Sequence, residues 1–158
     1  MDRPIEGFHR DADSDWVAEL SCGHTQHVRH QPPFRVREWV VSEAGRAGRL
    51  GSLLHCPACD RGELPSGFAP YQRTKTFTQD SVPEGLLANH ATKRGVWGLI
   101  HVQSGALLYT VAASQSAVLR LEPDVPGVIV AEVEHAVKPI GAVQFLVELW
   151  RRPKDQPG

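Results

Sequence analysis

The chain lacks the features that define several large protein classes. It has only three cysteines, an odd number that does not make a complete disulfide scaffold. No apolar run is long enough to span a bilayer, and no N-terminal stretch resembles a secretory signal. We therefore expect a cytoplasmic protein in a reducing compartment, without a membrane partner.

The chain also has no large net charge. The sequence has 17 basic and 18 acidic residues, which give a formal net charge of -1. This balance disfavours nucleic acid as a partner and excludes an acidic tail. The length of 158 residues allows one ordinary domain or two small ones.

Two short motifs point to a bound metal. Cys22 and His24 form a Cys-x-His pair around Gly23, and Cys56 and Cys59 form a Cys-x-x-Cys pair. Three thiols and one imidazole make a complete tetrahedral set for zinc. A redox motif of the thioredoxin type would need a βαβ pattern, which is absent. We therefore predict zinc at Cys22, His24, Cys56 and Cys59.

Other histidines near the cysteines leave an alternative open. His27, His30 and His55 are also close to a cysteine in sequence. We prefer His24 because it can share one turn with Cys22, whereas the others fit a solvated face or another ligand. A buried cysteine pair with surface histidines is the non-metal alternative.

The first block of the chain predicts a small β module. Residues 5–9 and 15–20 alternate apolar and polar side chains around turn formers at 11–14, as in a β-hairpin. A block of about 60 residues rarely buries enough apolar surface to be stable without a staple. We assign residues 1–62 to a zinc-stapled β module.

The rest of the chain predicts an antiparallel β domain. Residues 63–70 are rich in glycine and proline, which indicates a linker. Short apolar runs follow at 71–77, 96–102, 106–111, 117–121, 128–133 and 143–150. Turn formers separate them at 103–105, 113–115, 123–127 and 140–141. This regular spacing predicts a sandwich or barrel over residues 71–153.

Polar residues interrupt this second domain at three positions. His90, Glu132 and His135 could converge as two histidines and a carboxylate, a set that holds zinc or iron with open positions for a small molecule. Since Glu132 and His135 are three residues apart, this requires a bend between them. The alternative is that Glu134 and one histidine are solvated rim residues.

Two family resemblances add to this interpretation. The N-terminal block resembles a small bacterial zinc-binding family of unknown function, which implies a metal site at the cysteines. The residues that carry this resemblance are Gly7-Phe8-His9, Asp15-Trp16-Val17-Ala18-Glu19-Leu20, Cys22-Gly23-His24, Gln26-His27-Val28-Arg29-His30, Pro32-Pro33, Cys56 and Cys59.

The second block is similar to the tellurite-resistance TehB/YeaR-like cupin domains. The matching residues are Pro83-Glu84-Gly85-Leu86, His90, Thr92-Lys93, Gly95-Val96-Trp97-Gly98, Glu132, His135 and Val137. The resemblance implies a cupin-like antiparallel β-barrel linked to tellurite resistance. The general cupin metal motif, a His-x-His pair with a following Glu, is absent. Arg94 and Trp97 are our candidates for contact with a ligand.

Three functions follow from these patterns. We favour a cytoplasmic, stress-related protein that binds metal and a small molecule or oxyanion. The alternatives are a metal-dependent, oxygenase-like cupin enzyme, although no catalytic signature is present, and a zinc-based interaction module. The third draws on arginines that could form a phosphate-binding face, Arg29, Arg35, Arg37, Arg46 and Arg49. A homodimer formed through the cupin also fits this interpretation.

Overall fold

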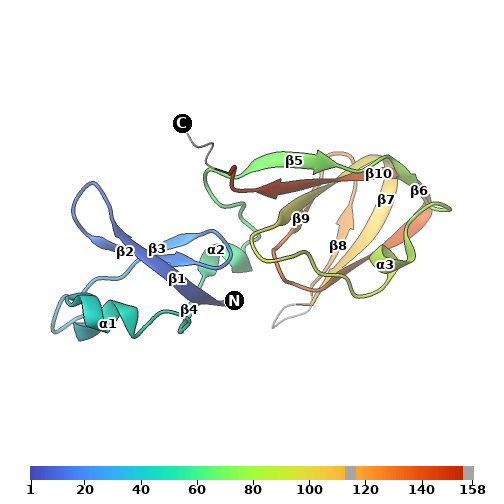
Figure 1. Cartoon of the computed structure of the whole chain (residues 1–158). Helices are drawn as coiled ribbons and strands as arrows, with labels where there is room; N and C mark the ends of the chain where they lie inside the picture. Colours follow the sequence, from blue (N-terminus) through green and yellow to red (C-terminus); the bar gives the residue numbers. More distant parts are fainter. Residues whose placement is uncertain (113–116, 155–158) are drawn as a thin grey trace. The chain divides into compact units, whose positions relative to one another are not determined.

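A computed structural model describes residues 1–112 and 117–154. The chain divides into two compact units, one formed by Met1–Arg61 and the other beginning at Gly62 (Figure 1). No helix in the described ranges has the length and apolar character needed to cross a membrane. The turn expected at 113–115 lies outside these ranges.

The N-terminal unit contains a four-stranded antiparallel sheet in the order β3-β2-β1-β4. Its strands are β1 (Asp2–Arg10), β2 (Trp16–Leu20), β3 (Thr25–His27) and β4 (Leu53–His55). The expected hairpin is present as β1 and β2. One carboxylate oxygen of Asp11 accepts hydrogen bonds from the backbone N–H groups of Asp13 and Asp15, each at 2.9 Å, and so fixes the turn between them.

Short helices connect the rest of this unit. They are η1 (Glu38–Val40), α1 (Glu43–Ala47) and α2 (Pro57–Asp60). The Ser42 hydroxyl caps α1 by accepting from the backbone N–H of Gly45 at 3.0 Å. Besides the cysteines, the buried apolar residues of the unit are few and mostly small: Ile5, Val17, Ala18, Leu20, Val28 and Val40.

The second unit is a curled, half-barrel antiparallel sheet in the order β5-β10-β7-β8, with β6 paired to β10 and β9 paired to β7. Its elements are β5 (Ala69–Arg73), β6 (Phe77–Thr78), α3 (Glu84–Leu87), β7 (Trp97–Val111), β8 (Ala117–Leu121), β9 (Gly127–Ile129) and β10 (His135–Arg151). The mainly β fold class is confirmed. β5 begins inside the segment that we expected to be a linker.

Two of the predicted turns are wrong, because long strands run through them. β7 passes through 103–105 and β10 passes through 140–141, and the two strands pair with each other along their length. The register shifts between Ile140 and Gln144, while Gly105 and Gly141 have φ angles of 77° and 64°. These bulges bend the paired strands and produce the curl of the sheet.

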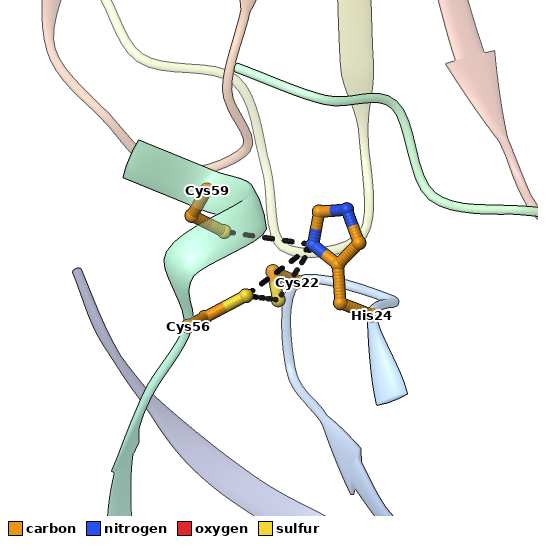
Figure 2. A group of neighbouring side chains, drawn as sticks. All are labelled: Cys22, His24, Cys56 and Cys59. Carbon is orange, nitrogen blue, oxygen red and sulfur yellow. Dashed lines mark hydrogen bonds between the residues drawn. The ribbon is translucent and has the colours of Figure 1, made fainter. Parts of the chain in front are cut away.

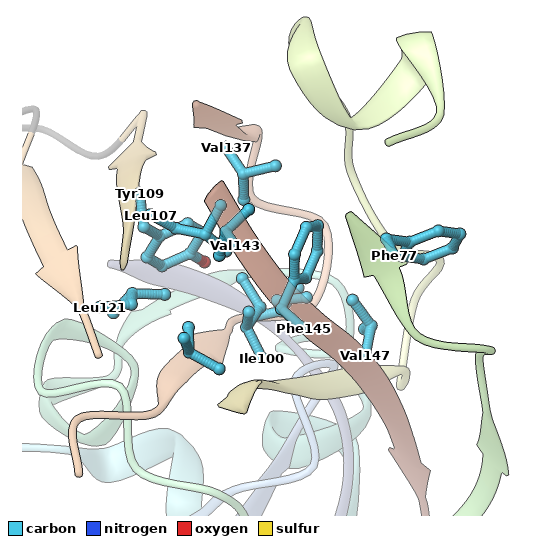
Figure 3. Packing of buried hydrophobic residues seen from close by; sticks show 11 residues of the cluster. Phe77, Ile100, Leu107, Tyr109, Leu121, Val137, Val143, Phe145 and Val147 are labelled. Carbon is cyan, nitrogen blue, oxygen red and sulfur yellow. The ribbon is translucent and has the colours of Figure 1, made fainter. Parts of the chain in front are cut away.

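The core of this unit is one cluster of buried hydrophobic residues (Figure 3). Its eleven buried residues are Phe77, Ile100, Val102, Leu107, Tyr109, Leu121, Ile129, Val137, Val143, Phe145 and Val147. The rings of Phe77 and Phe145 are 5.6 Å apart, and the buried Tyr109 hydroxyl donates to the Val128 carbonyl at 2.9 Å. This core is much larger than that of the N-terminal unit.

Candidate metal centre

A tight turn after β2 positions the first two predicted ligands. Gly23 adopts a φ of 95°, a left-handed conformation that disfavours residues with a Cβ. The Gly23 N–H donates to the Leu20 carbonyl at 2.8 Å, and the Leu20 N–H donates to the His24 carbonyl at 2.9 Å. The turn therefore directs Cys22 and His24 to one side of the chain.

The other two predicted ligands lie at the start of α2. Cys56 is the N-cap residue, Pro57 occupies the first helical turn, and Cys59 is within the helix. β4 pairs with β1, with His55 opposite Asp2, and this pairing carries Cys56 from a distant part of the sequence to the Cys22 turn.

The four side chains converge on one point (Figure 2). The Sγ atoms of Cys22 and Cys56 each lie 3.5 Å from His24 Nδ1, and that of Cys59 lies 3.7 Å from it. Cys22 Sγ and Cys56 Sγ are 3.9 Å apart. A zinc tetrahedron with the usual bond lengths has S–S edges of about 3.8 Å and S–N edges of about 3.6 Å. The donor atoms therefore have the spacing that zinc requires.

The three thiol groups are buried and lie close to one another. Cys22, Cys56 and Cys59 are each at most 2% exposed. Burial raises the pKa of Cys56, and a hydrogen bond with Cys22 together with burial raises the pKa of Cys59 to about 12. The same hydrogen bond lowers the pKa of Cys22. A divalent cation would supply the positive charge that three adjacent thiolates need.

The alternative histidines have other partners. His27 Nε2 lies 2.6 Å from a carboxylate oxygen of Asp11, and His30 Nδ1 accepts from the Arg37 backbone N–H at 2.9 Å. His55 contacts two carboxylates, those of Asp2 and Asp60. Of the four histidines near the cysteines, the structure brings His24 into the cluster.

Arg3, which lies close to this cluster, was not among the residues predicted from the sequence. Arg3 is only 6% exposed, and its positive charge, like the hydrogen bond with His24, lowers the pKa of Cys59 against the larger effects that raise it. Arg3 and Ile5 are two residues apart on β1, so both face inward. That alternation is the signal that could have identified Arg3.

In the second unit, the structure brings together two of the three predicted residues. His90 and His135 exchange backbone hydrogen bonds of 2.9 and 2.8 Å, and their rings are 5.4 Å apart in an edge-to-face arrangement. Glu132 lies in a turn with a φ of 63° and is exposed, whereas His135 is 2% exposed. The required bend is present, but Glu132 and His135 lie in different environments.

The two ring nitrogens of His135 have different surroundings. Its Nδ1 lies 3.1 Å from the Val133 carbonyl, and since a carbonyl only accepts, Nδ1 carries the proton. Nε2 then presents a lone pair, and it is buried without a hydrogen-bond partner. Burial, more than the neighbouring His90, lowers the pKa of His135, so the ring is held neutral. Tyr109 packs beside it, with ring centroids 5.9 Å apart.

The two remaining candidate contacts differ in accessibility. Arg94 is exposed, whereas the Trp97 side chain is fully buried near the start of β7. Trp97 pairs across the sheet with Trp150 of β10. The Trp97 side chain is therefore closed to a ligand in solution.

The observed features define a two-part chain, a small β module around three cysteines and a histidine followed by a curled antiparallel sheet. Residues 6–63 match a family described as a protein of unknown function, DUF3565, and residues 72–147 match the TehB-like domain. The chain thus combines a region that matches DUF3565 with a region that matches the TehB-like domain. No curated protein sequence shows significant similarity to it.

Two solved structures resemble the second unit. A structural-genomics protein from E. coli strain K12 matches with a TM-score of 0.52 and 23% identity, over 58% of this chain and 98% of that one. TehB from Haemophilus influenzae matches with a TM-score of 0.51 and 18% identity, over 55% of this chain. The match spans only 32% of the TehB chain. At these identities the likeness concerns the fold.

Proposed function

We propose that the N-terminal unit binds one zinc ion through Cys22, His24, Cys56 and Cys59. The observation that carries this proposal is the arrangement of four donor atoms that all lie within 4.8 Å of one another. Thiolate and imidazole ligands in a tetrahedral arrangement favour zinc over calcium or magnesium, which prefer oxygen ligands.

The role of this ion is structural in our proposal. Four protein ligands complete a tetrahedron and leave no position for a substrate, which distinguishes structural from catalytic zinc. The apolar core of the unit is too small to stabilise it alone. The ion would therefore hold the turn between β2 and β3 and the start of α2 together.

For the TehB-like domain we propose a TehB-related function, the binding of a small molecule or oxyanion in stress resistance of the tellurite type. The buried, unpartnered Nε2 of His135 supports this, because it can accept a hydrogen bond from a protonated ligand. The adjacent and exposed His90 gives a ligand a second contact. We place this activity in the cytoplasm.

A second divalent metal, zinc or iron, is the alternative occupant of the His90–His135 pair. A metal-binding histidine commonly donates its other ring N–H to a carbonyl, as His135 does toward Val133. Two imidazoles would leave open positions for a small ligand. Such a site would be compatible with a metal-dependent enzyme.

Elemental analysis of the purified full chain tests both sites. We expect one zinc per chain in the N-terminal unit, lost in His24→Gln and retained in the matched control His55→Gln. A second metal, if bound, should disappear in His135→Gln and remain in His101→Gln. Zinc retained by His24→Gln but lost by His55→Gln would contradict the assigned ligand set.

Oxyanion binding by the TehB-like domain needs a separate test. Tellurite and phosphate are titrated into the full chain by isothermal calorimetry, with His135→Gln and the control His101→Gln. Binding that is weakened only in His135→Gln supports the proposal. Equal heats from all three proteins would refute a ligand site at His135.

A further inference from the structure

A second feature of the N-terminal unit is a run of positive charge that the zinc cluster does not use. Residues 27–37 contain no acidic residue. Their basic side chains and imidazoles are His27, Arg29, His30, Arg35 and Arg37. Such a segment attracts anions, even though the whole chain is nearly neutral.

Part of this segment lines a cavity of about 280 Å³. The lining residues are His27, Arg29, Gln31 and Arg35. Gln31 and Arg35 exchange two backbone hydrogen bonds of 2.8 and 2.9 Å, which close the intervening loop and hold both residues at the cavity. The cavity is therefore formed by an ordered turn that follows β3.

Two carboxylates fix the orientation of two cavity residues. A carboxylate oxygen of Asp15 accepts from Arg29 at 2.7 Å, and one of Asp11 contacts His27 at 2.6 Å. The hydrogen bond with His27 lowers the pKa of Asp11, which keeps this carboxyl group ionised. These pairs place N–H donors at the cavity without filling it.

Arg35 supplies the uncompensated charge. No carboxylate within residues 1–112 and 117–154 lies within ion-pair distance of its guanidinium, and its side chain is exposed. A guanidinium has only donors, and its planar fork matches the oxygens of phosphate or sulfate. With Arg29 and the Gln31 amide, Arg35 can surround an oxyanion of that size.

A cation is a poorer match to the same place. The ligand atoms of Asp11, Asp15 and His27 lie within 4.8 Å of one another, but each already has a partner. The other oxygen of Asp11 accepts the backbone N–H groups of Asp13 and Asp15. Arg29 would also repel a cation at this position.

We propose that the cavity lined by His27, Arg29, Gln31 and Arg35 is an oxyanion site for a phosphate or a phosphate-like group. It is separate from the zinc cluster and from the His90–His135 pair. The site adds a binding activity to the N-terminal unit, in which the zinc ion has only a structural role.

The phosphate group could be free or part of a single-stranded nucleic acid. Phe34 lies in the loop closed by Gln31 and Arg35 and is 91% exposed. An exposed aromatic ring next to arginine is the combination that stacks on a base while the guanidinium contacts its phosphate. The two sources therefore differ in their dependence on Phe34.

The test uses the full chain at low ionic strength, where charge interactions are least screened. Inorganic phosphate is titrated by NMR, and a short single-stranded oligonucleotide is titrated by fluorescence anisotropy. The variants are Arg35→Gln, Phe34→Ala and the matched control Arg49→Gln, which alters an arginine that packs over Trp39 instead of lining the cavity. Zinc content is measured for each variant to verify that the unit is intact.

We expect Arg35→Gln to weaken phosphate binding about tenfold or more, and Arg49→Gln to leave it unchanged. If Phe34→Ala has no effect and the oligonucleotide binds no tighter than phosphate, the ligand is a free oxyanion. If the oligonucleotide binds tighter and both Phe34→Ala and Arg35→Gln weaken it, the phosphate belongs to nucleic acid. Absence of saturable binding, or an equal loss of binding in Arg49→Gln, would overturn the proposal.

Discussion

The N-terminal unit buries six apolar residues besides its cysteines, whereas the TehB-like domain packs eleven into one cluster that includes Tyr109, Phe77 and Phe145. Both units are antiparallel sheets, but their strands differ greatly in length. β3 and β4 have three residues each, while β7 and β10 have 15 and 17. The difference supports our proposal that a bound ion stabilises the N-terminal unit, whereas the second unit can rely on its core.

The largest expected effect is the loss of a zinc ligand. Cys56→Ser should remove zinc and unfold residues 1–61, because structural zinc contributes on the order of 10 kcal/mol, about the whole stability of a small domain. NMR should show loss of dispersed signals from this unit, while those of the TehB-like domain stay in place. A folded N-terminal unit without zinc would show that its core suffices.

The second prediction concerns a cavity made by substitution in the core of the TehB-like domain. Phe145 is fully buried, so Phe145→Ala should lower the free energy of unfolding of the TehB-like domain by about 3–5 kcal/mol. Urea denaturation of the full chain, followed separately for the two units, measures this effect. Zinc content should not change; a loss of zinc would mean that the two units depend on each other.

A smaller effect is expected at the bulge that curls the sheet. A Cβ at Gly105 would meet the Ala142 carbonyl oxygen at 2.1 Å, and its φ of 77° already disfavours other residues. Gly105→Ala should destabilise the domain by about 1–3 kcal/mol. Gly85→Ala, where a Cβ meets nothing within 4 Å, is the control. Equal thermal midpoints for the two variants would show that the bulge at position 105 does not require glycine.

The smallest expected effect is a pH dependence of the TehB-like domain. The ion pair with Arg73, 2.6 Å away, lowers the pKa of Glu148 below its ordinary value of 4.5. The stabilisation is therefore present above pH 4.5 and is lost as the pH falls through the folded-state pKa. Because Arg73 is largely exposed, we expect less than about 1 kcal/mol. Arg73→Gln should flatten the dependence of the free energy of unfolding on pH in this range. An unchanged pH dependence would contradict a stabilising role of the Arg73–Glu148 ion pair.

The sequence predicted local features of the fold well. Cys22-Gly23-His24 and the hairpin before it depend on turn residues that act within a few positions, so they could be identified without tertiary information. The turns expected at 103–105 and 140–141 were wrong for the opposite reason. A glycine inside a long strand and a glycine in a turn look alike until the partner strand is known.

The candidate sites show the same limit. Spacing identified Cys56 and Cys59, but only the pairing of β4 with β1 brings them to Cys22. Glu132 was grouped with His135 on the assumption that a bend would align them, whereas the turn leaves Glu132 exposed. A positive φ at a non-glycine residue has no clear signal in a single sequence.

Hydrogen exchange of the full chain, with and without a strong chelator, tests whether zinc holds the N-terminal unit folded. We expect the chelator to abolish protection of the backbone amides in residues 1–61, while β7 and β10 of the TehB-like domain keep theirs. Unchanged protection of β1 and β2 after complete removal of zinc would contradict this expectation. So would a loss of protection shared equally by both units.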